Sequence, residues 1–105
     1  MKLIIAIIHH EDTKNVEMHL REAHIYLTKI ASVGSFLEKG NTTLLIGTNR
    51  VDEVIRIISS YSQKRVVKKP IVPLNEFADL TSQYVEVEVG GATLFILDLQ
   101  EFRKM

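Results

Sequence analysis

The amino-acid sequence predicts a single α+β domain over residues 1–105, with a ferredoxin-like βαββαβ order and both helices on one face of an antiparallel sheet. Two observations favour this fold class. Short, β-branched apolar segments alternate with segments whose apolar residues recur at helical spacing. The chain also has 46% apolar and 25% charged residues, as ordinary folded domains do, and its 105 residues suffice for one compact domain.

The first strand and the first helix are predicted near the N-terminus. Leu3–Ile8 is short, apolar and β-branched, as expected of a strand that is buried on both faces. A helix is expected over about 13–24, with Asp12 or Thr13 as its N-cap. Its apolar residues recur at helical spacing: Val16, Leu20 and Ala23. His24 falls where a left-handed residue often ends a helix.

Two strands and a second helix are predicted next. The segments Ile25–Val33 and Thr43–Thr48 are expected to be strands, and the glycine- and asparagine-bearing segment 34–42 between them a short loop. The second helix is expected over about 50–63. Its apolar residues form a stripe on one face: Val51, Val54, Ile55 and Ile58.

The last third of the chain is predicted to be a long connection followed by two strands. Segment 64–83 contains both prolines and shows no periodicity, so it is expected to be an irregular loop that is functional or mobile. It begins with a basic cluster: Lys64, Arg65, Lys68 and Lys69. Regular alternation returns over Val85–Val89, Gly90-Gly91 marks a bulge or a close approach of the backbone, and Ala92–Leu97 is the last core strand. These strands are too apolar for one sheet face to stay in water, so the chain is expected to form an oligomer.

Composition excludes several classes of function. Thirteen basic and thirteen acidic residues cancel, so no overall positive field attracts nucleic acid or an anionic membrane. Without cysteine there is no disulfide, thiolate nucleophile or Cys-ligated metal. The apolar run Leu3–Ile8 is too short for a signal peptide or a membrane span, so a soluble, cytoplasmic protein without membrane insertion is expected.

Histidines offer only a weak metal signal. His9 and His10 are adjacent, and neighbouring side chains of a strand point to opposite faces. His19 and His24 are too far apart to share one helix face well. We therefore expect no metal site.

Residues 27–47 carry the most specific signal in the chain: LTKIASVGSFLEKGNTTLLIG. This stretch resembles the core motif of the cyclic di-AMP receptor family of PII-like signal transduction proteins, TKLASTGGFLxxGNTTLLIG. The opening residues 1–7 and the segment 90–95 are also similar to that family. The resemblance covers essentially the whole chain and is weakest over 64–83.

The resemblance implies a homotrimer that binds the dinucleotide at clefts between neighbouring subunits. Two loops would report occupancy to an unidentified protein target: segment 34–42 would match the T-loop of the family, and 64–83 its longer B-loop. It also implies a set of ligand-binding positions: Thr28, Ser35, Phe36, Leu37, Asn41, Gly47 and Phe95. Their chemistry suits a dinucleotide, because neutral donors such as Thr28 and Asn41 can bind phosphate and an aromatic such as Phe36 can stack on a base.

The chain departs from the family at two positions, with Tyr26 where arginine is usual and Ser35 where glycine is usual. Loss of a guanidinium contact to phosphate, worth roughly 1.5–3 kcal/mol, would weaken binding about tenfold to more than a hundredfold. A basic residue elsewhere, from the cluster 64–69 or near the C-terminus such as Arg103, could supply that charge. The alternative is a divergent PII-like paralogue that binds another adenine nucleotide, or only a protein partner.

Other interpretations of the same residues stay open. Phe36 and Leu37 could pack against a neighbouring subunit, and Asn41 after Gly40 is a common turn residue. The fold also hosts small hydrolases such as acylphosphatases. The sequence has no Ser/His/Asp constellation or acid pair suited to catalysis, so we expect neither catalytic residues nor a cofactor.

Overall fold

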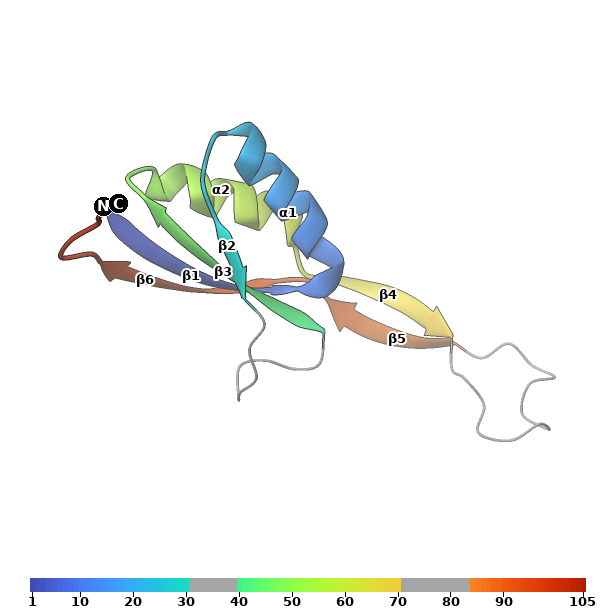
Figure 1. The fold of residues 1–105 in the computed structure, drawn as a ribbon. Coiled ribbons are helices and arrows are strands. Elements are labelled where there is room, and N and C mark those ends of the chain that lie inside the picture. The colour runs from blue at the N-terminus through green and yellow to red at the C-terminus, as the bar shows by residue number, and fades with distance from the viewer. Residues whose placement is uncertain (31–39, 71–83) are drawn as a thin grey trace.

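The computed structural model describes residues 1–30, 40–70 and 84–105, which form a four-stranded sheet, two helices and a separate two-stranded ribbon (Figure 1). The elements are β1 (Lys2–His9), α1 (His10–Glu22), β2 (Thr28–Ile30), β3 (Asn41–Thr48), α2 (Val51–Tyr61), β4 (Arg65–Pro70), β5 (Tyr84–Val89) and β6 (Ala92–Asp98). The sheet order is β2-β3-β1-β6 with antiparallel neighbours, and β4 pairs with β5. This order confirms the ferredoxin-like α+β fold, with the ribbon inserted before the last strand.

The hydrophobic core lies between the sheet and the two helices, which cover the same face (Figure 1). Alternate residues of β1 are fully buried: Ile4, Ala6 and Ile8. They pack with the apolar stripes of the helices and with alternate residues of β3; the largest fully buried side chains include Leu20, Leu44, Ile46 and Ile58. Every second residue of β1 and β3 thus packs against the apolar stripes of α1 and α2 on one side of the sheet.

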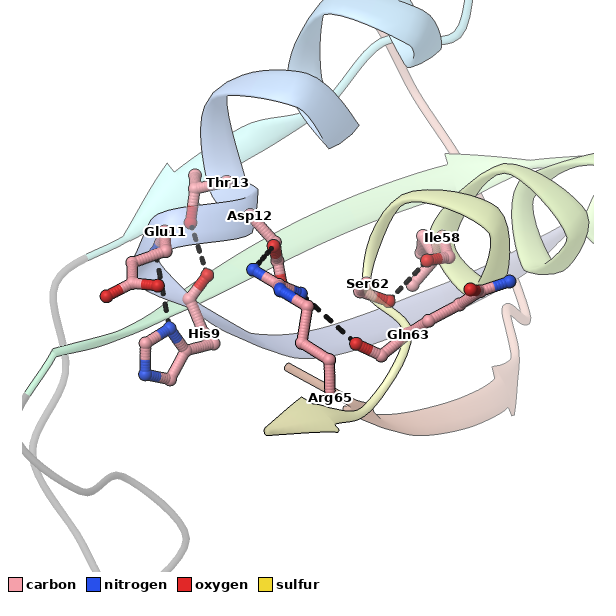
Figure 2. Close-up of polar contacts among 8 residues, drawn as sticks. All are labelled: His9, Glu11, Asp12, Thr13, Ile58, Ser62, Gln63 and Arg65. Carbon is pink, nitrogen blue, oxygen red and sulfur yellow. Dashed lines mark hydrogen bonds and ion pairs between the residues drawn. The ribbon is translucent and has the colours of Figure 1, made fainter. Parts of the chain in front are cut away.

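Helix α1 begins directly after β1, earlier than predicted. Its N-cap is His9, whose ring nitrogen Nδ1 accepts a hydrogen bond from the Glu11 amide at 3.3 Å (Figure 2). The prediction that Asp12 or Thr13 caps the helix is wrong, because both side chains are buried within the first turn. The Thr13 hydroxyl donates to the His9 carbonyl at 3.3 Å, and the Asp12 carboxylate binds Arg65. The strand-to-helix switch also corrects the expectation that His9 and His10 point apart, since their ring centroids lie 4.8 Å apart.

The C-terminal end of α1 confirms the prediction for His24, which has φ 58°. The His24 amide donates to the Arg21 carbonyl and the Ile25 amide to the Leu20 carbonyl, both at 2.9 Å. This pair of bonds is the Schellman motif, and Ile25 and Leu20 both belong to the core cluster. Residue 25 therefore closes the helix instead of starting a strand. The second strand is shorter than the predicted 25–33: β2 spans Thr28–Ile30, and 31–33 lie outside the described residues.

The prediction that segment 64–83 is an irregular loop is wrong for its first part, because Arg65–Pro70 forms β4. Cross-strand pairing with β5 explains this, with Val67 opposite Val87 and Lys68 opposite Glu86. A strand that gains its partner from a distant segment needs no strong periodicity of its own. Residues 71–83 lie outside the described residues. The predicted strands 85–89 and 92–97 are confirmed as the cores of β5 and β6.

The root of the ribbon is fastened to the body of the domain (Figure 2). Arg65 Nη2 lies 2.8 Å from Asp12 Oδ1 and Nη1 lies 3.3 Å from Oδ2, a bidentate ion pair between β4 and α1. The hydrogen bond that the Arg65 guanidinium donates to this carboxylate raises the pKa of Arg65 above its ordinary value. Directly after β5, Gly90 at φ 84° lies so close to the Gln63 carbonyl that a Cβ there would collide with it. The ribbon therefore leaves the domain at a specified position.

Candidate functional site

The face of the sheet that the helices leave open gathers the candidate residues. Residues opposite one another in an antiparallel sheet share a face. Register places Thr28 opposite Leu45, Leu45 opposite Ile5, and Ile5 opposite Phe95, so these four residues form one row across the sheet. By the same alternation, Asn41 and Gly47 of β3 lie on this open face. The four candidates that the structure describes, Thr28, Asn41, Gly47 and Phe95, thus share one face.

The open face is apolar and only partly covered. Leu3, Ile5, Ile7 and Leu45 are half-buried, and the β6 side chains on this face remain accessible, with Phe95 39% and Leu97 45% exposed. On the covered face, by contrast, Ile4, Ala6 and Ile8 are 0% exposed. Contiguous apolar surface of this kind marks a binding or association surface.

A groove of about 690 Å³ lies at the end of this face where β1 begins and β6 ends. Its volume falls within the range of about 300–1,000 Å³ usual for small-molecule sites. Thr28 and Gly47 line it, together with Tyr26 and residues of the C-terminal segment 99–105. Two of the predicted site residues are therefore brought together, and this part of the site is built from β2, β3 and the C-terminal segment.

Packing within the chain does not require a glycine at position 47, where the groove has room for a side chain. A Cβ added there would meet its nearest neighbour, Met1 Sδ, at 3.9 Å, an ordinary van der Waals distance. Glycine inside a strand costs roughly 0.5–1 kcal/mol relative to alanine. Because packing within the chain does not demand this glycine, a molecule that approaches the backbone from the groove offers a reason for it.

Local contacts fix the strand that carries Thr28. The Schellman motif at the end of α1 turns the chain, and buried Ile25 is followed by Tyr26, which is 84% exposed at the groove. Next to Thr28, the Lys29 ammonium lies 3.3 Å from Glu17 Oε1, which accepts no well-aligned hydrogen bond in the described structure. This ion pair ties β2 to α1, so the three-residue strand does not rely on its ladder with β3 alone.

The C-terminal segment brings both charge signs to the groove. The guanidinium of Arg103 is engaged by the carboxylate of Glu101 in an ion pair. The Lys104 ammonium lies 5.7 Å from the centroid of the Tyr26 ring, within cation–π range. Sequence reasoning named Arg103 as a possible source of charge but missed Lys104 and Phe102, because no periodicity marks a segment that follows the last strand.

Asn41 lies at the opposite end of β3 from Gly47. At about 3.4 Å per residue their separation along the strand is roughly 20 Å. Asn41 is the first residue of β3 and pairs with His9, so the prediction that it belongs to the loop 34–42 is corrected. It lines a second, polar hollow of about 280 Å³ with Lys64 and Glu88. Within one chain, therefore, the structure does not bring Asn41 into the groove.

Three predicted site residues, Ser35, Phe36 and Leu37, lie outside the described residues. The basic cluster 64–69 belongs to the ribbon, which projects from the opposite end of the sheet from the C-terminus (Figure 1). There Arg65 is engaged by Asp12, and Lys68 is opposite Glu86. This cluster does not line the groove around Tyr26.

Residues 1–30, 40–70 and 84–105 contain no group of three or more His, Asp or Glu side chains placed to hold a metal ion. In the same ranges no helix has both the length and the apolar character that crossing a membrane requires.

Comparison with known proteins agrees with the fold and with the motif of residues 27–47. A crystal structure described as that of a functionally unknown protein from Pediococcus pentosaceus ATCC 25745 is 32% identical to this chain, with a TM-score of 0.74. The match covers 99% of this chain and 96% of the other. The sequence model of the family described as "Cyclic-di-AMP receptor" matches residues 1–105, the whole chain. The chain therefore belongs to the cyclic-di-AMP receptor family.

Proposed function

We propose that this protein is a signalling receptor that binds cyclic di-AMP and has no catalytic activity of its own. Membership of the family supports a nucleotide-binding signalling role. The observation that supports the proposed site is the groove on the open face, because Thr28 and Gly47 line it together. The Thr28 hydroxyl can donate to a phosphate oxygen, and Gly47 leaves its backbone open to close approach.

The proposed receptor is a homotrimer in the cytoplasm whose ligand lies between subunits. The half-covered apolar row of Leu45, Ile5 and Phe95 supports association of copies through the open face. The separation of Asn41 from Gly47 along β3 also favours a shared site. If both residues contact one ligand, a second copy must bring its Asn41 end to the groove of the first.

Signalling in this proposal passes through the segments that follow the candidate residues. In the sequence, the T-loop-like segment 34–42 follows β2 and includes the start of β3, and the B-loop-like segment 64–83 includes β4 and precedes β5. A ligand that contacts β2 and β3 would bias the conformation of the segment between them and so alter the surface presented to a protein target.

Isothermal titration calorimetry of the purified protein with cyclic di-AMP tests this function, with ATP and cyclic di-GMP as competitors. The expected result is low-micromolar or tighter binding, near one ligand per subunit, and selective for cyclic di-AMP. Gly47→Val should abolish that binding while the thermal unfolding transition is retained, because the open side of Gly47 accepts a side chain. No heat and no thermal shift with cyclic di-AMP would contradict the proposal.

The alternative is a receptor of the same fold for another adenine nucleotide or for a protein alone. Tyr26 favours it, because an exposed phenol ring stands at the groove where the family usually has a guanidinium. Tight binding of ATP with none of cyclic di-AMP would support this alternative. A Tyr26→Arg variant that gains cyclic di-AMP binding would support it too.

A further inference from the structure

We propose that Tyr26 and Lys104 act together as a recognition pair for a nucleotide, in which the ring stacks on the base and the ammonium binds a phosphate. The inference rests on the proposed function and deepens it by assigning the cationic contact of the site. It comes from the geometry of the groove, where an aromatic ring and a cation from distant parts of the chain meet.

Tyr26 presents its ring with little packing against the protein. It is 84% exposed although its neighbour Ile25 is buried, so the helix-closing turn holds the backbone while the side chain stands free. Stacking of a base on such a ring tightens binding by about five- to 150-fold. Since any flat base has a π-face, the ring contributes affinity without selecting the base.

Lys104 is better placed than Arg103 to bind the anion. Arg103 already forms an ion pair with Glu101, so a phosphate must compete with that carboxylate. The Lys104 ammonium instead lies over the Tyr26 ring, 5.7 Å from its centroid. A cation–π contact at an exposed site is weak, so a phosphodiester can displace it at little cost.

Ligand binding in this proposal is an exchange of partners. In the free protein the ammonium occupies one face of the ring; in the complex the base takes the ring and the phosphate takes the ammonium. The exchange draws the C-terminal segment over the bound nucleotide. This segment has few fixed contacts to move, since Phe102 is 60% exposed and Arg103 is 74% exposed in its side chain.

Calorimetric titration of the full chain with cyclic di-AMP tests the pair. Lys104→Gln is expected to weaken binding about 10- to 100-fold and to reduce its dependence on salt. Tyr26→Leu should weaken binding about tenfold, whereas Tyr26→Phe, which keeps the ring, should bind as the wild type does. Arg103→Gln should weaken the affinity for cyclic di-AMP less than Lys104→Gln does. The matched control is Lys14→Gln. Lys14 is an exposed lysine on α1 away from the groove, so this substitution should leave the affinity for cyclic di-AMP unchanged.

A second measurement separates a recognition pair from a residue that matters only for folding. Aromatic ring currents should shift the Lys104 side-chain proton resonances in the free protein. The shift should disappear in Tyr26→Leu and on addition of cyclic di-AMP, when the ammonium leaves the ring.

The outcomes distinguish the two proposals. If the wild type binds cyclic di-AMP and Lys104→Gln binds equally well, the pair is overturned and the receptor function stands. A larger loss for Arg103→Gln than for Lys104→Gln would transfer the phosphate contact to Arg103 and overturn the assignment to Lys104. If the wild type binds none of cyclic di-AMP, cyclic di-GMP and ATP, the receptor function fails and the pair fails with it.

Discussion

The two faces of the four-stranded sheet are built from similar residues but have different surroundings. On β1, the alternate residues Ile4 and Ile8 are fully buried under the helices, while Ile5 and Ile7 on the other face are only half-buried. Since composition does not distinguish the faces, the helices do: α1 and α2 cover one side, and the described part of the chain places no helix over the other (Figure 1). The covered face stabilises the domain, and the open face is available for a ligand and for further copies.

The largest expected effect lies on the covered face. Ile46→Ala removes a fully buried side chain of β3 and leaves a cavity among the helices, so the free energy of unfolding should fall by about 2–5 kcal/mol. Urea denaturation followed by circular dichroism measures the change. A loss below about 1 kcal/mol would mean that the core can collapse around the missing side chain.

Two neighbouring residues of β6, Ile96 and Leu97, lie on opposite faces of the sheet. Ile96 and Leu97 are almost equally exposed, at 43% and 45%, but only Leu97 lies on the open face, opposite Leu3. Leu97→Glu should convert the proposed trimer into monomers, because it places a charge in an apolar interface. Analytical ultracentrifugation measures the mass, with Ile96→Glu as the matched control. If Ile96→Glu alone dissociates the protein, copies associate through the other face or the sheet edge.

A third effect, smaller and local, is expected where the ribbon joins the body. Arg65→Gln leaves the buried Asp12 carboxylate, which is 5% exposed in its side chain, without its bidentate partner. Amide hydrogens of β4 and β5 should then exchange several-fold faster, while those of β1 and β3 should be unchanged. Hydrogen-exchange mass spectrometry measures both sets. If exchange became equally faster in β1, β3, β4 and β5, the ion pair would stabilise the whole domain and not the ribbon alone.

The smallest effect concerns the exposed pair at the end of β1 and β6. Lys2 Nζ lies 2.7 Å from Asp98 Oδ1, and this hydrogen bond holds the pKa of the Asp98 carboxyl below its ordinary value. A depressed pKa stabilises the fold above the unfolded-state pKa of about 3.9, and the contribution is lost as the pH falls through the folded-state pKa. Asp98→Asn should therefore lower Tm slightly at pH 7 but not near pH 2. A difference that persisted in acid would assign the effect to something other than charge.

Much of the fold follows from local pattern. A short, apolar, β-branched run predicts the strand at Leu3–Ile8, and alternation predicts the strand at Val85–Val89. Helical spacing predicts the two helices, and the position of His24 predicts a left-handed helix end. Failures occur where a distant partner decides. β4 has no pattern of its own and forms because β5 lies beside it. The Asp12 carboxylate, expected to cap α1, lies inside the first turn and binds Arg65, 53 residues away.

The candidate site divides in the same way. The motif over 27–47 is enough to identify the family and to name Thr28 and Gly47, which register then places at one groove. Nothing in the sequence indicates that Lys104 lies over Tyr26, because the 77 residues between them carry no signal that the two side chains meet.

The sequence by itself determined the periods of the strands and helices, the apolar character of both sheet faces, and the family. The periods and the apolar faces depend on residues two to four positions apart, and the family depends on the contiguous motif over 27–47. The tertiary structure alone decided which apolar face the helices cover, where the ribbon is fastened, and which cation reaches the groove. Each of these depends on contacts between distant segments, and the free energy of such contacts is set by the packed fold as a whole.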